Sequence, residues 1–189
     1  MRARVESGDL SLAALDALEV DSIAAFVGPE RPLQGLAGLV DWRLCGAVSR
    51  AILARTFSPE SGEALLLPSG GRFPVPRIFC FGLTGESEAA AEAAVRRACE
   101  VLAKAGARRV AVALPATRPG APLARAWMEA SLKAGFSLQV LLGDGRALAR
   151  ELDSAVREMR ADAEVVAPVA NVEPGRTAAS LPARGPVVR

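Results

Sequence analysis

The sequence has no histidine and no tyrosine among its 189 residues, and only two tryptophans and six phenylalanines. So few aromatic side chains leave little surface on which nucleic-acid bases could stack. The 23 Lys and Arg residues nearly balance the 21 Asp and Glu residues, so the chain also lacks the concentrated basic surface that binds phosphate backbones. These absences argue against nucleic acid as a partner.

Catalytic side chains are equally scarce. Without histidine, acid–base chemistry near neutral pH would need a carboxylate, a lysine or a cysteine with a shifted pKa. The two lysines, Lys104 and Lys133, lie near the ends of Ala-rich helical segments, where a cation favours the helix dipole. Three widely spaced cysteines in apolar segments, Cys45, Cys80 and Cys99, are typical of reduced, buried side chains. The sequence therefore predicts no catalytic residue, no metal site and no cofactor.

Long hydrophobic runs are also missing. Asp9, Asp16 and Glu19 interrupt the first twenty residues, and nowhere does an apolar stretch reach the roughly 20 residues that a membrane span requires. We therefore expect a cytoplasmic protein without a membrane partner. Apolar residues still make up 51% of the chain, which is ample for the core of one domain of this length.

Strand-like and helix-like patterns alternate along most of the chain. Short apolar runs predict strands, and apolar residues that recur every three to four positions predict helices. The strands are expected at 9–15, 22–28, 63–68, 76–82, 108–115 and 137–142, and the helices at 33–57, 87–105, from Pro122 to Gly135, and around the stripe formed by Leu148, Leu152, Val156 and Met159.

This alternation predicts an α/β fold with right-handed crossovers and a mostly parallel sheet. The runs at 63–68 and 76–82 are joined by a Gly- and Pro-rich turn, so this pair is expected to be antiparallel. The expected architecture is a three-layer α/β/α domain with a mixed sheet over residues 1–161. From residue 162 onward several prolines and no sustained period predict a flexible tail, 162–189.

Three segments resemble the N-terminal domain of the leucyl aminopeptidase family: LVDWRLCGAVSRAILARTFSPESGEALLLP, PRIFCFGLTGESE and AAAEAAVRRACEVLAKAGARRVAVALP. The matching residues are Gly46, Gly62, Glu63, Gly82 and Leu83. The resemblance covers about residues 20–116 and implies a macro-domain-like fold. In that family two metal ions bind in a separate C-terminal domain, and its Asn-Thr-Asp-(Ala or Gly)-Glu-Gly-Arg segment does not occur here. The resemblance thus implies the non-catalytic domain alone.

Two loops are candidates for binding an anionic ligand. Gly70, Gly71 and Arg72 combine a glycine pair with a guanidinium group, and Gly82 and Thr84 lie between a strand and the start of a helix. The first loop is more typical of a plain turn, and the second of a helix cap in which Ser87 or Thr84 supplies the capping oxygen. GDGR at 143–146 lacks the lysine of a phosphate-binding loop, so Asp144 is predicted to be a helix cap.

Three functions follow as hypotheses. The first is a non-catalytic interaction, scaffold or regulatory domain that binds another protein or itself. The second is a small-ligand module for a nucleotide or ADP-ribose-like anion near Gly70, Gly71, Arg72, Gly82 and Thr84, although the Asn-rich and GVxGA-like loops of ADP-ribose-binding macro domains do not occur. The third is a subunit of a metallo-aminopeptidase assembly.

Overall fold

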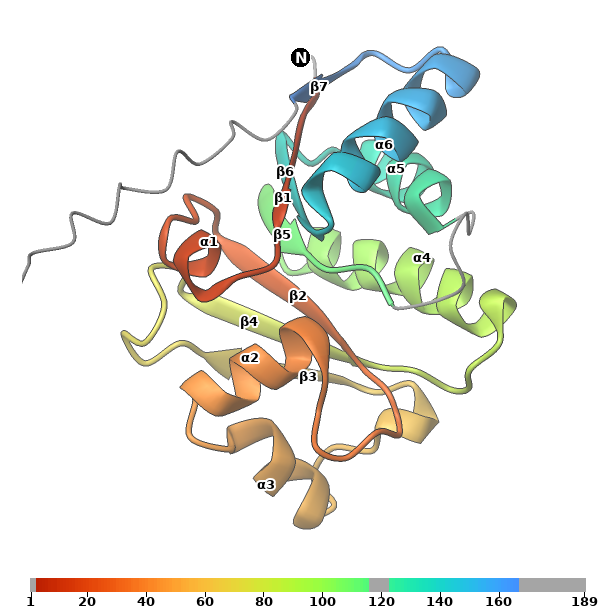
Figure 1. The fold of residues 1–189 in the computed structure, drawn as a ribbon. Helices are drawn as coiled ribbons and strands as arrows, with labels where there is room; N and C mark the ends of the chain where they lie inside the picture. The colour runs from red at the N-terminus through yellow and green to blue at the C-terminus, as the bar shows by residue number, and fades with distance from the viewer. Residues whose placement is uncertain (1–2, 116–122, 167–189) are drawn as a thin grey trace, which may run out of the picture.

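A computed structural model describes residues 3–115 and 123–166, which form one seven-stranded sheet between two layers of helices (Figure 1). Every pair of neighbouring strands is parallel except β3 and β4, which are antiparallel. The predicted mixed, mostly parallel sheet is therefore confirmed. The strand order is β3-β4-β2-β5-β6-β1-β7, with bounds Ala3–Asp9 (β1), Ser22–Val27 (β2), Ala64–Pro68 (β3), Arg77–Gly82 (β4), Arg109–Val112 (β5), Leu138–Gly143 (β6) and Ala163–Val166 (β7).

The sheet divides the hydrophobic core into two clusters, one between each face and the helices that cover it. Val95, Trp127 and Leu152, from α4, α5 and α6, lie in one cluster, whereas Leu15 and Val40, from α1 and α2, lie in the other. The helices are α1 (Leu12–Asp16), α2 (Gly35–Arg43), α3 (Ala47–Leu53), α4 (Glu88–Lys104), α5 (Leu123–Ala134) and α6 (Gly145–Met159), with a short 3₁₀ helix η1 (Pro59–Ser61).

The first strand differs from the prediction. Residues 9–15 were expected to be a strand, but β1 ends at Asp9 and α1 begins at Leu12, with the Ser11 hydroxyl accepting a hydrogen bond from Ala14 N at 3.1 Å. Along β1 the residues alternate between buried and less buried positions, with Ser7 buried although it is polar. A strand with so little apolar content gives no hydrophobic signal in the sequence.

The predicted helix at 33–57 is two helices with a sharp turn between them. Cys45 and Gly46 both have left-handed backbone angles, with φ of 55° and 79°. Gly46 N donates to the Asp41 carbonyl at 2.7 Å, which closes the end of α2, and α3 begins at the next residue. The apolar period continues through the turn, so the period alone did not reveal the break.

The sheet also extends beyond the predicted domain boundary at residue 161. Ala163–Val166 form β7, which pairs in parallel with β1 over Ala3–Glu6. A segment of four residues is too short for its sequence pattern to predict a strand. It becomes a strand because it pairs with the edge of β1. The remainder of the predicted tail, 167–189, lies outside the described residues.

Asp21 ties together the amino ends of three neighbouring strands. Its carboxylate accepts hydrogen bonds from Arg108 N at 2.9 Å and Arg109 N at 2.8 Å, from the Ser22 hydroxyl at 2.7 Å, and from Arg77 Nη2 at 2.9 Å. Burial raises the pKa of Asp21, but the hydrogen bonds from Ser22 and the two backbone N–H groups, together with Arg77, outweigh burial and lower it. The ionised form of Asp21 therefore stabilises the fold.

Replacing Asp21 with asparagine is expected to lower the free energy of unfolding by about 1–3 kcal/mol at neutral pH, because the amide cannot accept from all these donors. Because folding lowers the pKa of Asp21, the ionised carboxylate stabilises the folded protein at pH values above the unfolded-state pKa of about 3.9. This contribution is lost as the pH falls through the pKa of Asp21 in the folded protein. Urea unfolding should therefore show the difference between wild type and Asp21→Asn shrinking as the solution is acidified.

The surface carboxylate Asp16 supplies the control for this prediction. It pairs with Arg43 at an exposed position, so Asp16→Asn should change the stability much less than Asp21→Asn. A destabilisation of Asp21→Asn that stays constant from neutral pH to acid would contradict the stabilising role of the ionised Asp21.

Candidate functional site

The five residues predicted to bind a ligand lie at opposite ends of β4. Gly70, Gly71 and Arg72 belong to the connection that precedes β4, whereas Gly82 is its last residue and Thr84 follows it. A strand rises about 3.3 Å per residue, so the six residues of β4 separate the two groups by on the order of 15–20 Å. The structure does not bring the five residues into one crevice.

The connection before β4 is fastened to α2. Arg72 Nη1 donates to the Arg43 carbonyl at 3.4 Å, and the Arg43 guanidinium lies 5.2 Å from the centre of the buried Phe73 ring. Gly70 and Gly71 have φ of 58° and 76°, which supports the interpretation of this loop as a turn. Arg72 thus contacts a helix end of its own chain.

The other end of β4 is covered by η1. Gly82 N donates to the Glu63 carbonyl at 2.9 Å, and a Cβ atom on Gly82 would lie 2.2 Å from the Pro59 carbonyl oxygen. Gly82 is therefore required for close packing of two backbone segments. Thr84 is exposed just beyond this contact.

Two helices begin at this same end of the sheet, where the parallel strands finish. Side chains of the protein cap the N-termini of both helices. Ser87 accepts from Ala90 N at 3.2 Å at the start of α4, as predicted, and Asp144 accepts from Ala147 N at 3.0 Å at the start of α6. A second carboxylate, Asp9, accepts from Gly145 N at 2.9 Å.

These caps oppose the binding of an anion. A helix N-terminus attracts negative charge, but at α6 two carboxylates already occupy that position and would repel a phosphate. Asp144 was predicted from the sequence to be a helix cap but Asp9 was not, because Asp9 lies 136 residues before Gly145 and only the pairing of β1 with β6 brings it there. Residues 116–122, which follow β5, lie outside the described part of the chain.

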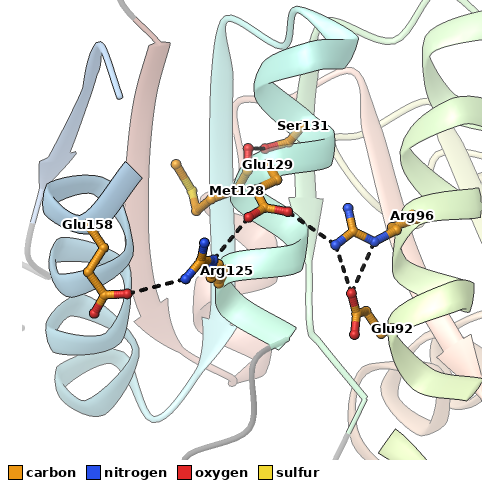
Figure 2. A network of polar contacts seen from close by, with 7 residues as sticks. All are labelled: Glu92, Arg96, Arg125, Met128, Glu129, Ser131 and Glu158. Atoms are coloured by element: carbon orange, nitrogen blue, oxygen red, sulfur yellow. Dashed lines mark hydrogen bonds and ion pairs between the residues drawn. The ribbon is translucent and has the colours of Figure 1, made fainter. Parts of the chain in front are cut away.

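The outer surface of α4, α5 and α6 carries a chain of ion pairs (Figure 2). Arg96 contacts Glu92 at 2.7 Å and Glu129 at 3.1 Å, and Arg125 contacts Glu129 at 3.0 Å and Glu158 at 3.6 Å. Hydrogen bonds from Arg125 and Arg96 lower the pKa of Glu129. Each of these arginines pairs with carboxylates of the same network. We therefore interpret this surface as a solvated face that links the three helices.

A groove of about 700 Å³ lies beside this network, between α4 and α5. The Cys99 side chain lines it, yet burial raises the pKa of Cys99 to about 12, and burial likewise raises that of Cys80 to about 12. Thiols with such high pKa values carry almost no thiolate at neutral pH and are poor nucleophiles. Both cysteines are buried as predicted, whereas the prediction for Cys45 was wrong, because its place in the turn after α2 leaves it exposed.

A second groove, of about 500 Å³, lies at the corner where α2 meets α3. Trp42 lines it with 66% of its surface exposed. Asp41 also lines it, but this carboxylate accepts from Ser49 N at 3.0 Å and from the Ser49 hydroxyl at 2.6 Å, so it caps α3. We call this feature the Trp42 groove; its lining residues are Pro32, Leu33, Gly38, Asp41, Trp42, Cys45 and Gly46.

Local backbone packing builds the Trp42 groove. A Cβ atom on Gly38 would lie 2.3 Å from the Leu33 carbonyl oxygen, so glycine at this position lets the loop after β2 lie directly against α2. Neither Trp42 nor the groove was singled out from the sequence. The signal that could have revealed it is Gly46, whose left-handed conformation turns the chain away just after Trp42.

Among residues 3–115 and 123–166, no group of His, Cys, Asp and Glu side chains is arranged to hold a metal ion. Within the same ranges, every helix is too short or too polar to span a bilayer. Within these ranges the Trp42 groove, with its exposed indole ring, is the candidate functional site.

Known proteins resemble this chain in both sequence pattern and fold. A family model described as the N-terminal domain of the cytosol aminopeptidase family matches residues 24–141. Comparison with curated protein sequences gave no match. Among solved structures, a mutant leucine aminopeptidase from tomato is 20% identical with a TM-score of 0.56, over 82% of this chain and 35% of the tomato chain. This chain thus spans about a third of that enzyme's length.

Macrodomains have the same fold. A Trypanosoma brucei macrodomain in complex with ADP is 16% identical with a TM-score of 0.62, over 82% of this chain and 69% of that one. A mutant macrodomain from Oceanobacillus iheyensis is 15% identical with a TM-score of 0.57, over 82% of this chain and 92% of that one. These likenesses show a macro-domain-like fold, and the family model covers more than half of the sequence. The chain therefore belongs to the cytosol aminopeptidase family, through the N-terminal domain of that family.

Proposed function

We propose that this chain is a non-catalytic domain that binds another protein, and that the Trp42 groove is its binding surface. The observation that carries the proposal is the exposure of Trp42, at 66%, on the rim of a groove of about 500 Å³. A tryptophan contributes more contact area than any other side chain, and tryptophans are enriched among the residues that dominate binding energies.

The surroundings of Trp42 fit this role. Leu53, on the neighbouring helix α3, is 83% exposed and adds apolar surface to the same pair of helices. Asp41 is engaged in capping α3, so it does not present a free carboxylate to a partner. The partner that fits such a surface inserts an apolar side chain beside the indole ring.

The proposal is tested by Trp42→Ala. The tagged wild type and the variant are purified from the cells that make the protein, and co-purifying proteins are quantified by mass spectrometry. We expect at least one protein to be enriched with the wild type and depleted about tenfold with the variant, since loss of a hot-spot side chain costs about 1.4 kcal/mol or more.

Leu12→Ala provides the control, because Leu12 is a partly exposed apolar residue, at 37%, on a different helix. This variant should retain the same partners as the wild type. If the same proteins co-purify in equal amounts with the wild type and with Trp42→Ala, the proposed role of the groove is wrong.

Binding of an ADP-ribose-like anion is the second candidate function. Its support is the macro-domain-like fold, which the T. brucei protein shares in complex with ADP. The carboxylates of Asp9 and Asp144 at the start of α6 count against it, as does the cover that η1 forms over Gly82. Calorimetric titration with ADP-ribose discriminates the two functions. Saturable heat would favour binding of the anion, and a titration without heat would favour binding of a protein.

Participation in a metallo-aminopeptidase assembly is a finer version of the first proposal. Its support is membership of the cytosol aminopeptidase family through the N-terminal domain. Identification of a catalytic aminopeptidase domain among the proteins that depend on Trp42 would favour this version.

A further inference from the structure

We propose that the free edge of β3 pairs with β3 of a second copy of this chain, which joins the two sheets into one. The strand is the last in the sheet order, and within the described ranges it pairs with β4 alone. This surface is separate from the Trp42 groove, so the two proposals are tested independently.

The backbone of β3 presents hydrogen-bonding groups at this edge. Bonds from Gly82 N to the Glu63 carbonyl, at 2.9 Å, and from Ser69 N to the Pro76 carbonyl, at 3.1 Å, show that the odd-numbered residues of this segment face β4. In an antiparallel pair the intervening residues direct their backbone groups away from the partner strand. The even-numbered residues Ala64, Leu66 and Pro68 therefore direct theirs to the free edge.

The side chains of the same residues make the edge apolar. Ala64, Leu66 and Pro68 are exposed, with Leu66 at 54%, whereas Leu65 and Leu67 are half-buried against the core on the α2 face. A charged side chain is one means by which natural sheets protect an exposed edge, and the exposed Glu164 supplies one on β7 at the opposite end of the sheet. From Ala64 to Pro68 the edge of β3 contains no charge.

A second copy complements this edge through a two-fold axis at Leu66. In this register the two Leu66 residues exchange two N–H to C=O bonds, and each Ala64 N–H donates to a Pro68 carbonyl, which gives four bonds. Pro68 lacks an N–H group, and its outward position at the end of the strand tolerates this. Each chain has one such edge, so the contact is isologous and closes at a dimer.

The contact is small. A five-residue strand covers much less than the 1,200–2,000 Å² or so that a stable interface buries. We therefore expect a reversible dimer with a dissociation constant on the order of 10–100 μM.

Sedimentation velocity from about 1 μM to 1 mM protein tests the proposal. The wild type should shift from monomer to dimer across this range. Leu66→Pro removes an outward N–H without touching the bonds to β4, and Ala64→Lys adds a charge to the edge; each should raise the dissociation constant at least tenfold. Leu12→Lys, which replaces a partly exposed leucine on α1, should leave the dimer unchanged.

Amide hydrogen exchange of the wild type gives a readout that needs no variant. The Leu66 amide should exchange slowly at high protein concentration and fast at low concentration, whereas Leu65 and Leu67, which face β4, stay slow at both. A wild type that remains monomeric at 1 mM would overturn the proposal, as would a dimer unaffected by Leu66→Pro and Ala64→Lys. A dimer lost in Trp42→Ala but kept in Leu66→Pro would assign self-association to the Trp42 groove instead.

Discussion

Trp127→Ala is expected to lower the free energy of unfolding by about 3–5 kcal/mol, as large-to-small replacements of buried aromatic residues do. Trp127 is fully buried between α5 and the sheet, with its ring centre 6.3 Å from that of Phe136. Its Nε1 donates to the buried Gln139 Oε1 at 2.8 Å. The replacement leaves a cavity and removes the partner of that oxygen.

Gln139 makes the loss harder to compensate. Its Nε2 already lacks a hydrogen-bond partner among the described residues, so the alanine variant would leave both ends of a buried amide unsatisfied. The cost therefore includes a polar penalty in addition to the cavity.

Trp42→Ala is the matched control, because it deletes the same side chain from a position that is 66% exposed. Its stability should stay within about 0.5 kcal/mol of the wild type. Urea denaturation followed by circular dichroism compares the two variants without depending on tryptophan fluorescence. Similar unfolding midpoints for the two alanine variants would contradict the core position of Trp127.

Gly82→Ala is expected to lower the free energy of unfolding by about 3 kcal/mol, because overpacking a buried site forces the backbone to move. The added Cβ would lie 2.2 Å from the Pro59 carbonyl oxygen and 2.6 Å from Pro59 Cα. Both contacts are with backbone atoms of η1, which cannot turn aside as a flexible side chain can.

Gly85→Ala provides a control three residues away. The nearest atom to a Cβ at Gly85 is Ala90 Cβ, at 4.0 Å, which is an ordinary contact. Urea denaturation should therefore show a large shift for Gly82→Ala and a small one for Gly85→Ala. Equal shifts would mean that the role of Gly82 is not close packing against η1.

Gly82 also shows how one sequence signal can have two physical explanations. The glycine was a matching residue in the family resemblance and a candidate for binding an anion. The structure gives it a packing role, since its distinguishing contact is with Pro59. A glycine that permits the approach of a ligand and one that permits the approach of another backbone look the same in a sequence.

Elements with strong local patterns were predicted well. A helix was expected at 87–105, and α4 spans Glu88–Lys104. It buries Ala91, Val95, Ala98 and Leu102 on one face and ends before Gly106, which has a φ of 73°. Burial of one face every three to four residues and a glycine at the end are both local features, so a short window of sequence contains them.

Elements that depend on a neighbouring strand were missed. β1 contains the polar residues Glu6 and Ser7, and β7 has four residues, so neither shows a clear period. Each becomes a strand because it pairs with another, β1 with β6 and β7 with β1. Strand formation depends on such pairing more than helix formation depends on its neighbours.

The sequence by itself determined the layered α/β architecture, the antiparallel β3–β4 pair and the relationship to the aminopeptidase family, because these follow from periodicity, turn residues and local motifs. Only the tertiary structure separated Gly70, Gly71 and Arg72 from Gly82 and Thr84, placed Asp9 at the start of α6, and left Trp42 exposed. These outcomes depend on which strands are neighbours and on where a helix ends. Both depend on contacts between residues far apart in the sequence, which a local hydrophobic period does not reveal.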